Sequence, residues 1–421
     1  MSPTPRQIED LPALADHVEP EVWAQDVVAA SAAVQAATHE RIFRDRDGGL
    51  TVLGHRALRE LAEHPDVGNT PRTFLESRAA DRARRKGTAV EEGPAPFTRF
   101  LHNQVFTHNP PVHTASRRLV GQPLLPRRAA DLGDAAARTA SHLLADLAER
   151  RTVDLVHDFA GPYVCRFWAE QLGMPSHAAE ELPEVMDAMN AMFLFDPAPD
   201  DVARLRAATA RYVDLVSDAI DASATSTAIT AYVREHLDRT EGLEDPVSAG
   251  RFIASNYFDG FHTAGVAVAS TLKHLLDSPE SLRQVREDPG LAANAFQEAT
   301  RLATPVMVST RLTSAEVTLD DVRIPSGTPL AMVWAAGNRD PDVYDDPHTF
   351  DLHRGGGLGM TFGGGIHLCP GRNVAKMLAE AAVTALIDAR VRITPIQPSA
   401  TWIPGSAMRV LASLPVAVSS R

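Results

Sequence analysis

Apolar residues recur at every third or fourth position through most of the chain, the spacing that gives an α-helix one buried face. Alanine, the strongest helix former, is abundant in the same stretches. The pattern predicts helices near residues 20–38, 55–64, 112–123, 128–149, 155–172, 176–194, 199–223, 247–277, 279–288, 291–303 and 370–389. Helix is therefore the main expected secondary structure.

Strand-like segments are few and short. Residues 42–46 and 50–53 flank the turn sequence Asp47 to Gly49, which predicts a β-hairpin. Further short strands are expected near residues 306–312, 317–319, 329–332 and 410–418. The pattern as a whole predicts a mainly α, α+β fold in which many helices carry small peripheral β-sheets.

No Gly/Ser-rich or Pro-rich linker divides the chain, so a single domain is expected over residues 1–421, with residues 1–18 loosely ordered. The one long polar connection spans residues 70–107. Such a length is unusual in a compact domain unless the loop has a function. We expect residues 78–93 to be solvated, and the aromatic end at residues 97–106 to line a pocket.

Composition narrows the class of protein. The net charge of −13, without a block of Lys or Arg, argues against a nucleic-acid partner. The two cysteines, Cys165 and Cys369, are too few for a disulfide framework and indicate a reducing compartment. Cys165 lies in an apolar helical stretch and is expected to be buried. Residues 1–26 contain no apolar run of membrane-spanning length, so we expect a cytoplasmic protein without a membrane partner.

Cys369 stands in a short glycine-rich segment that precedes a predicted helix. The segment runs from Phe362 through three glycines and His367 to Cys369, Pro370 and Gly371. Glycines let the backbone turn tightly around the sulfur, and Pro370 is predicted at the first helical position. A helix N-terminus lowers a thiol pKa, so Cys369 is expected to be a thiolate. Such a thiolate suits an axial ligand of haem iron, because its donation favours O–O cleavage.

The pattern Phe-x-x-Gly-x-x-x-Cys-x-Gly resembles the haem-binding loop of the cytochrome P450 family. The resemblance implies that Cys369 is the axial ligand of the iron of haem b and that Phe362, Gly365 and Gly371 complete the loop. The mostly helical layout with small sheets at both ends is similar to the single domain of that family over nearly the whole chain.

Two further sets of residues fit the same family. Glu298 and Arg301 form a Glu-x-x-Arg pair, and Arg354 matches the third member of the family's buried Glu/Arg/Arg cluster. Glu280 and Arg283 repeat the spacing, and only position along the chain distinguishes the two pairs.

Haem carries two propionates, which need cations. His113 and Arg117 lie four residues apart, on one helix face, in a segment similar to the family's Pro-Pro-x-His-x-x-x-Arg motif. The resemblance implies that they bind a propionate. Arg311 matches a third cation of the set, and His367 a further donor.

The predicted helix 247–277 is expected to cross the distal haem face. At the centre of this helix the family has five consecutive positions: a small residue, glycine, any residue, an acid and threonine. In the family the small residues admit dioxygen, and the acid and the threonine deliver protons. Here Gly260 and Thr263 fit, whereas Asp259 replaces the small residue and His262 replaces the acid. His262 is one candidate for the proton relay. Asp259, one turn before Thr263, is the other, or else it recognises the substrate.

The resemblance implies a haem-thiolate monooxygenase that uses dioxygen to hydroxylate or epoxidise a small organic metabolite, in bacterial secondary metabolism. An alternative is non-hydroxylating chemistry at the same iron, by oxidative coupling, cyclisation or desaturation. A third hypothesis is a non-catalytic haem-binding module. The sequence does not identify the substrate, but it offers candidate pocket residues from four segments: Phe97, Phe100, Phe106, Asn256, Phe261, Val306, Val308 and Met408.

Electrons are expected from a separate protein, because the sequence has no nucleotide or flavin fingerprint. The implied partner is a ferredoxin with its reductase. Arg118, Arg372 and Lys376 would gather near the start of helix 370–389, where an acidic ferredoxin could dock. We expect the enzyme to act as a monomer.

Overall fold

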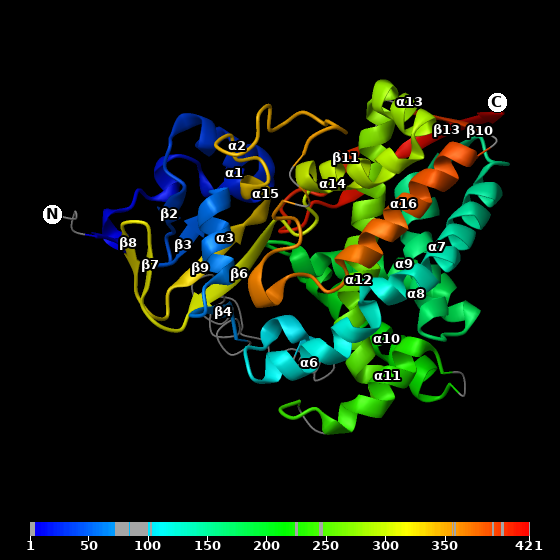
Figure 1. The fold of residues 1–421 in the computed structure, drawn as a ribbon, viewed down its shortest axis with the longest axis horizontal. Helices are drawn as coiled ribbons and strands as arrows, with labels where there is room; N and C mark the ends of the chain where they lie inside the picture. Colours follow the sequence, from blue (N-terminus) through cyan, green and yellow to red (C-terminus); the bar gives the residue numbers. More distant parts are fainter. Residues whose placement is uncertain are drawn as a thin grey trace.

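The computed structural model describes residues 5–71, 84, 100, 101, 103–223, 226–243, 247–355, 357, 359–389, 391–396 and 400–420. Figure 1 shows a sheet-rich end, which holds the N-terminal residues, beside a larger helical body. Phe97, a predicted pocket residue, lies outside the described residues. So does the expected solvated stretch 78–93, apart from Arg84, which is exposed.

Every predicted helix is present. The helices are α1 (Pro20–Gln25), α2 (Val27–Ala37), α3 (His55–Glu63), α6 (Val112–Gly121), α7 (Pro126–Leu147), α8 (Gly161–Gln171), α9 (Ser176–Met189), α10 (Pro199–Asp221), α11 (Ala228–His236), α12 (Ala249–Asp277), α13 (Pro279–Glu287), α14 (Ala292–Leu302), α15 (Trp334–Gly337) and α16 (Arg372–Asp388). The segment expected at 20–38 divides at Asp26, whose carboxylate accepts the N–H groups that begin α2. Helices α11 and α15 were not expected.

The strands are short, as predicted. They are β1 (Arg6–Gln7), β2 (Ile42–Arg44), β3 (Leu50–Val52), β4 (Val67–Asn69), β5 (Thr152–Asp154), β6 (Val308–Thr313), β7 (Val317–Leu319), β8 (Val322–Ile324), β9 (Pro329–Val333), β10 (Val391–Pro395), β11 (Thr401–Trp402), β12 (Leu411–Ser413) and β13 (Pro415–Ser420). The described residues form a five-stranded sheet in the order β2-β3-β9-β6-β4, two three-stranded sheets, β1-β8-β7 and β10-β13-β5, and the pair β11-β12. The small peripheral sheets are thus confirmed.

The predicted hairpin is confirmed, since β2 and β3 pair antiparallel with Ile42 opposite Val52. The single strand expected at 410–418 is wrong, because the segment divides into β12 and β13, which belong to different sheets. Leu414 stands between them, fully buried, and its N–H donates to the Asp154 carboxylate over 3.1 Å. Periodicity alone could not show this break.

The expected loose order of residues 1–18 is also wrong for residues 6–16. Arg6 and Gln7 pair in parallel with β8, and residues 8–10 and 14–16 form short 3-10 turns. The Arg6 guanidinium contacts the carboxylates of Glu40 and Asp321, both over 3.0 Å. A strand pairing and two ion pairs therefore attach this segment to the sheet-rich end.

Helix α12 runs through the middle of the helical body (Figure 1). It packs against α8, α10, α14 and α16, and most of its side chains are buried. Ser248 caps its first turn by accepting the N–H of Arg251 over 3.1 Å. A rigid, buried helix of this length can hold side chains at fixed positions along the centre of the molecule.

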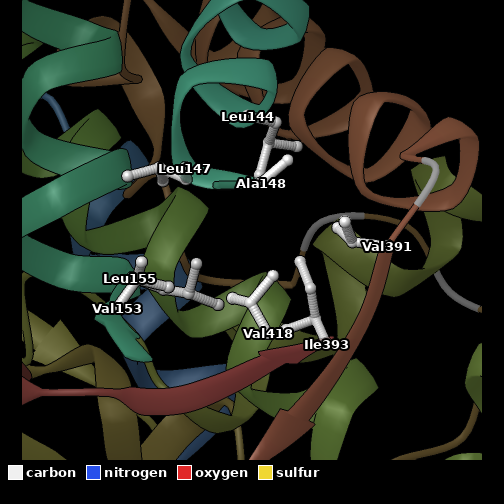
Figure 2. Close-up of a pocket in the computed structure, with 8 residues that line it drawn as sticks. All are labelled: Leu144, Leu147, Ala148, Val153, Leu155, Val391, Ile393 and Val418. Atoms are coloured by element: carbon white, nitrogen blue, oxygen red, sulfur yellow. The ribbon is translucent and has the colours of Figure 1, made fainter. Parts of the chain in front are cut away.

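An apolar pocket lies between α7 and the sheet β10-β13-β5 (Figure 2). Eight aliphatic side chains line it, and the gap is too narrow to hold a water molecule. It contains no predicted site residue, and Cys369 lies elsewhere, so we regard it as a seam between packed elements. Among the described residues, no helix is long and apolar enough to span a membrane.

Candidate active site

The segment around Cys369 forms a closed turn. The N–H of Cys369 donates to the Phe362 carbonyl over 3.0 Å, and the N–H of Leu368 donates to the Gly365 carbonyl over 3.2 Å. Gly365 has a φ of +61°, and a Cβ there would stand 2.1 Å from the carbonyl oxygen of Ala62. Any residue other than glycine would therefore displace this turn from α3.

The Cys369 thiol does not behave as its sequence suggested. Helix α16 begins at Arg372, so Pro370 precedes the helix and does not occupy its first position. Burial raises the pKa of the Cys369 thiol, while the N–H of Gly371 and the charge of Arg117 lower it. Burial prevails, so the expected net lowering of this pKa is wrong for the free thiol. The N–H and the arginine nevertheless provide the environment that a metal-bound thiolate needs.

Four predicted cationic or donor residues gather beside this turn. The Arg117 guanidinium donates to the Leu368 carbonyl. The rings of His113 and His367 share a hydrogen bond, 3.1 Å from Nε2 to Nδ1. Arg311, from β6, stacks over the Trp334 ring. Three segments far apart in the sequence thus meet at one place.

This cluster is electrostatically incomplete. Burial and positive neighbours lower the pKa of His113 to about 4 and that of His367 to about 3, and burial lowers the pKa of Arg311 to about 10. Among the described residues no carboxylate pairs with Arg117 or Arg311, and no group accepts a hydrogen bond from the buried Nε2 of His367. Groups so placed need anionic acceptors. The two propionates of the expected haem fit this donor set.

Two residues of the site were not predicted. Asn69, at the end of β4, brings its side-chain nitrogen within 3.0 Å of His367 Nδ1. Asn338, after α15, accepts the Met360 N–H over 2.7 Å and donates to the Thr361 hydroxyl over 3.0 Å, so it fixes the start of the cysteine loop. Their partners are distant in sequence, and neither asparagine has a local motif that could have revealed it.

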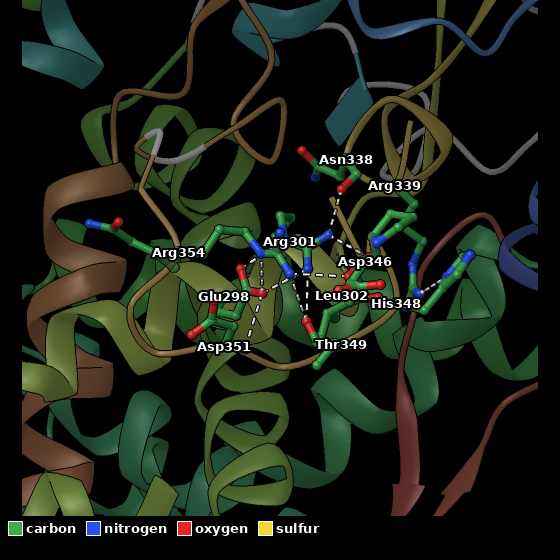
Figure 3. Close-up of polar contacts among 12 residues, drawn as sticks. Glu298, Arg301, Leu302, Asn338, Arg339, Asp346, His348, Thr349, Asp351 and Arg354 are labelled. Atoms are coloured by element: carbon green, nitrogen blue, oxygen red, sulfur yellow. Dashed lines mark hydrogen bonds and ion pairs between the residues drawn. The ribbon is translucent and has the colours of Figure 1, made fainter. Parts of the chain in front are cut away.

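The predicted Glu/Arg/Arg cluster is present and buried (Figure 3). Arg301 binds both carboxylate oxygens of Glu298 over 2.7 Å, and Arg354 Nε donates to the same carboxylate over 2.8 Å. Arg301 also donates to the Asn338 carbonyl over 2.8 Å. Through Asn338 the cluster is connected to the cysteine loop, so it supports the position of Cys369.

Thr263 and Asp259 share one face of α12. The Thr263 hydroxyl donates to the Asp259 carbonyl over 2.6 Å. Both residues keep some accessible surface, although Phe258, Phe261 and His262 beside them are buried. The Asp259 carboxylate also raises the pKa of the Cys369 thiol, so the two groups lie within electrostatic reach of each other.

Gly260 has a packing role that the sequence did not suggest. Its carbonyl accepts the Trp168 indole N–H over 3.0 Å, and a Cβ at this position would stand 3.2 Å from the same ring. Trp168 belongs to α8. The glycine therefore permits close packing of α12 on α8, whereas the sequence had suggested an opening for dioxygen.

His262 lies on another side of α12. Its Nε2 bonds to the Asn190 side chain, and its ring lies 5.2 Å from that of Phe193. Burial lowers the pKa of His262 to about 4, so the ring is neutral at pH 7. No described contact connects it to Thr263, so its expected part in a proton relay stays a prediction.

Two predicted pocket residues lie in the core. Phe100 is 1% exposed and packs edge-on against Tyr212 and Phe258. Phe261 is 2% exposed and lies against Trp168 and Tyr212. These aromatic rings fill the space between α8, α10 and α12. The expectation that Phe100 and Phe261 line a pocket is therefore wrong for this structure.

Two others lie where the loop joins α12. Asn256 donates to the Asn103 carbonyl over 2.7 Å and accepts the Val105 N–H over 2.9 Å, so its amide holds the loop against the helix. Phe106, in the next turn, is 44% exposed. Asn256 thus positions the loop, while Phe106 lies at the surface.

The last three predicted pocket residues follow α14 or lie near the C-terminus. Val306 and Met408 form an isolated bridge and pack with Val266 of α12. Val308 begins β6 and is partly buried. Val306 and Met408 thus place apolar groups beside α12 at the level of Val266. Val266 follows Asp259 by seven residues, or about two helical turns.

The comparisons with known proteins agree with this site. A sequence model of the family described as Cytochrome P450 matches residues 251–390. The C-19 steroid 1alpha-hydroxylase of Sorangium cellulosum is 29% identical over 286 residues, which cover 65% of this chain and 71% of the relative. The cyclomarin C epoxidase CymV of Salinispora arenicola is 26% identical over 384 residues, 86% of this chain and 95% of the relative.

The fold is also shared with solved structures. The crystal structure of P450BioI, in complex with an acyl carrier protein ligated to hexadec-9Z-enoic acid, superposes with a TM-score of 0.79 at 20% identity and covers 94% of this chain and 100% of that one. Sequence and fold lead to the same assignment. The family model, the relatives and the fold together support a bacterial cytochrome P450, a haem-dependent oxidoreductase of the monooxygenase kind.

Proposed function

We propose that this protein hydroxylates or epoxidises a small organic metabolite in bacterial secondary metabolism, with haem b as its cofactor. The observation that carries the proposal is the set of arginine and histidine donors beside the Cys369 turn, to which the described residues offer no carboxylate. Bound haem supplies the iron chemistry that cleaves dioxygen and oxidises the substrate, and thiolate donation assists that cleavage. Relatives whose names include hydroxylase and epoxidase support these two reactions.

Each part of the site has a proposed task. Cys369 ligates the iron, with the Gly371 N–H at its sulfur. His113, Arg117, Arg311 and His367 bind the propionates, and each charge-assisted hydrogen bond contributes about 1.5–3 kcal/mol. Phe362, Gly365 and Gly371 shape the loop.

Thr263 holds a proton at its hydroxyl, on the face of α12 that also carries Asp259. Because that hydroxyl donates to the Asp259 carbonyl, its oxygen is oriented with lone pairs available to accept a proton donor. We expect Thr263→Ala to uncouple the reaction, so that NADPH consumption continues, peroxide accumulates and product falls. Ser at the same position retains the hydroxyl and is the control.

A second candidate function is oxidative coupling, cyclisation or desaturation. The placement of His262 against Asn190 favours it, because this side chain then supplies no proton beside Thr263. The variant His262→Ala distinguishes the two candidate functions. If His262 relays protons, the variant uncouples as Thr263→Ala does. Unchanged coupling in both variants would favour the non-hydroxylating chemistry.

We propose that a ferredoxin with its reductase supplies electrons to a cytoplasmic monomer. Arg118 is exposed, and Lys376, paired with Glu380 over 3.6 Å, lies in the first turns of α16. Arg372 donates to the Cys369 carbonyl over 3.0 Å, so reversing its charge would also disturb the loop. Arg118→Glu and Lys376→Glu should therefore slow reduction without changing substrate affinity, and the effect should fade at high salt.

The central experiment combines the purified holoenzyme, a surrogate ferredoxin and reductase, NADPH and a library of metabolites. Displacement of water from the haem is followed in the Soret band, and products are identified by mass. A product that gains one oxygen atom supports the proposal. Loss of two hydrogens or dimer formation would support the second candidate, and no substrate-dependent NADPH consumption would contradict both.

A further inference from the structure

Asp259 differs from the other enclosed carboxylates of the described residues because it has no hydrogen-bond or ion-pair partner. Glu298 binds two arginines, and Asp340 accepts the N–H of His55 over 2.8 Å and pairs with Arg41 over 3.4 Å. For Asp259, the described residues offer no hydrogen-bond donor and no cation to its carboxylate. An enclosed carboxylate without a partner is costly to keep charged, and burial raises the pKa of Asp259 to about 7.

Asp259 lies on the face of α12 that also carries Thr263, one turn before it. Its charge raises the pKa of both the Cys369 thiol and the Tyr212 hydroxyl, so the carboxylate lies within electrostatic reach of each. Part of the residue remains accessible in the middle of a buried helix, as expected of a side chain that faces room for a ligand.

We propose that Asp259 binds a protonated amine of the substrate, so that the metabolite oxidised at this site is a basic nitrogen compound. The inference rests on the proposed function of the same site. It also accounts for a charged side chain at a position where the family resemblance leads one to expect a small residue.

An amine fits better than a neutral hydroxyl for a physical reason. A neutral group can bond equally well to a protonated acid, so it gains little from a carboxylate. A cation restores the charged form of the carboxylate and compensates its burial. The surrounding field agrees, since Arg117 and Arg311 belong to the expected propionate side and Arg372 donates to the cysteine loop. Val306, which is partly buried and packs against Val266 and Met408, then offers apolar contact to the rest of the ligand.

The test uses three probes with the same decyl chain: N,N-dimethyldecylamine, 1-decanol and decanoate. Their affinities for the holoenzyme are measured by calorimetry, which needs no turnover, and by the Soret shift. We expect the amine to bind at least about 10-fold more tightly than the alcohol, and decanoate to bind least.

Asp259→Asn keeps the shape of the side chain and removes its charge. We expect this variant to lose the preference for the amine while its affinity for 1-decanol stays unchanged. Asp277→Asn, at the end of the same helix, is the matched control and should retain the preference, because its carboxylate pairs with Lys273 at the surface. An unchanged melting temperature confirms that each variant is folded.

Three results would overturn the inference. The first is equal affinity of the wild type for amine and alcohol. The second is an amine preference that survives Asp259→Asn. The third is a variant with unchanged affinities and lower coupling, which would make Asp259 a proton relay. The absorption of the reduced, carbon monoxide-bound protein distinguishes failure of the proposed function from failure of this inference. Without thiolate absorption the proposed function fails. Thiolate absorption without a preference for the amine overturns this inference alone.

Discussion

Two Glu-x-x-Arg pairs lie on the consecutive helices α13 and α14 and have the same sequence pattern in very different surroundings. Glu280 and Arg283 of α13 are 2.6 Å apart, with side chains 62% and 54% exposed. Glu298 and Arg301 of α14 are 2.7 Å apart, with both side chains only 5% exposed. The distances are almost equal, so contact length says nothing about the importance of either pair.

The surroundings make the difference. The exposed pair interacts with its own helix and water, and such pairs contribute about 0.3–0.5 kcal/mol. The buried pair shares its carboxylate with Arg354 and connects to the cysteine loop through Asn338. Residues of one type with different burial recur elsewhere in the chain: Arg117 and Arg118, His262 and His142, Cys369 and Cys165. Each such pair provides a variant and its control.

The largest effect is expected from Glu298→Gln, which leaves the buried Arg301 and the half-buried Arg354 without a carboxylate. Breaking a buried ion network in this way costs about 3–5 kcal/mol. We expect a large fall in the free energy of unfolding, measured in urea, and loss of bound haem. Glu280→Gln should change stability by less than about 0.5 kcal/mol. Equal effects of the two substitutions would contradict the contrast between the pairs.

A smaller effect is expected from Arg117→Gln, which removes a half-buried cation from the propionate site. One charge-assisted hydrogen bond is worth about 1.5–3 kcal/mol, so haem affinity should fall by roughly 10- to 100-fold. The measurement is the transfer of haem to an excess of a scavenger protein. Its neighbour Arg118 is exposed, and Arg118→Gln should leave transfer unchanged. Equally fast transfer from both variants would show that Arg117 holds no propionate.

The third effect concerns the pH dependence of stability and is smallest near pH 7. His262 has its pKa lowered to about 4 by burial, while the unfolded side chain titrates near 6.5. The unfolded chain therefore takes up a proton first as pH falls, and stability is lost between about pH 6.5 and 4, by up to about 1.4 kcal/mol per pH unit. His262→Gln should reduce this slope in urea unfolding. His142→Gln, on the exposed side of α7, should not, and equal slopes in all three proteins would refute the argument.

Much of the site could be predicted because its residues lie at short, fixed spacings. The cysteine loop, the His113 and Arg117 pair and the Glu298 and Arg301 pair are each contained in ten residues or fewer. The helices could be predicted equally well, since a regular repeat of apolar residues reveals the buried face of a helix. These features depend on local sequence, and the structure confirms that they come together.

The rest depends on packing that local sequence does not contain. Periodicity shows that Phe261 and His262 are on a helix, but not that one meets Trp168 and the other Asn190. Asn69 and Asn338 act through partners from other parts of the chain. The net rise of the Cys369 pKa follows from burial, which outweighs the helix terminus on which the sequence argument relied.

The most direct test of the whole account is the absorption of the reduced, carbon monoxide-bound protein, compared between its two cysteines. Cys369 lies in the turn beside Arg117, whereas Cys165 belongs to α8 and is buried in the protein core. We predict that the wild type and Cys165→Ala absorb at the long wavelength typical of thiolate-ligated haem, and that Cys369→Ser does not. Absorption typical of histidine ligation in fresh wild-type protein, or thiolate absorption that survives in Cys369→Ser, would contradict the assignment of Cys369 as the iron ligand.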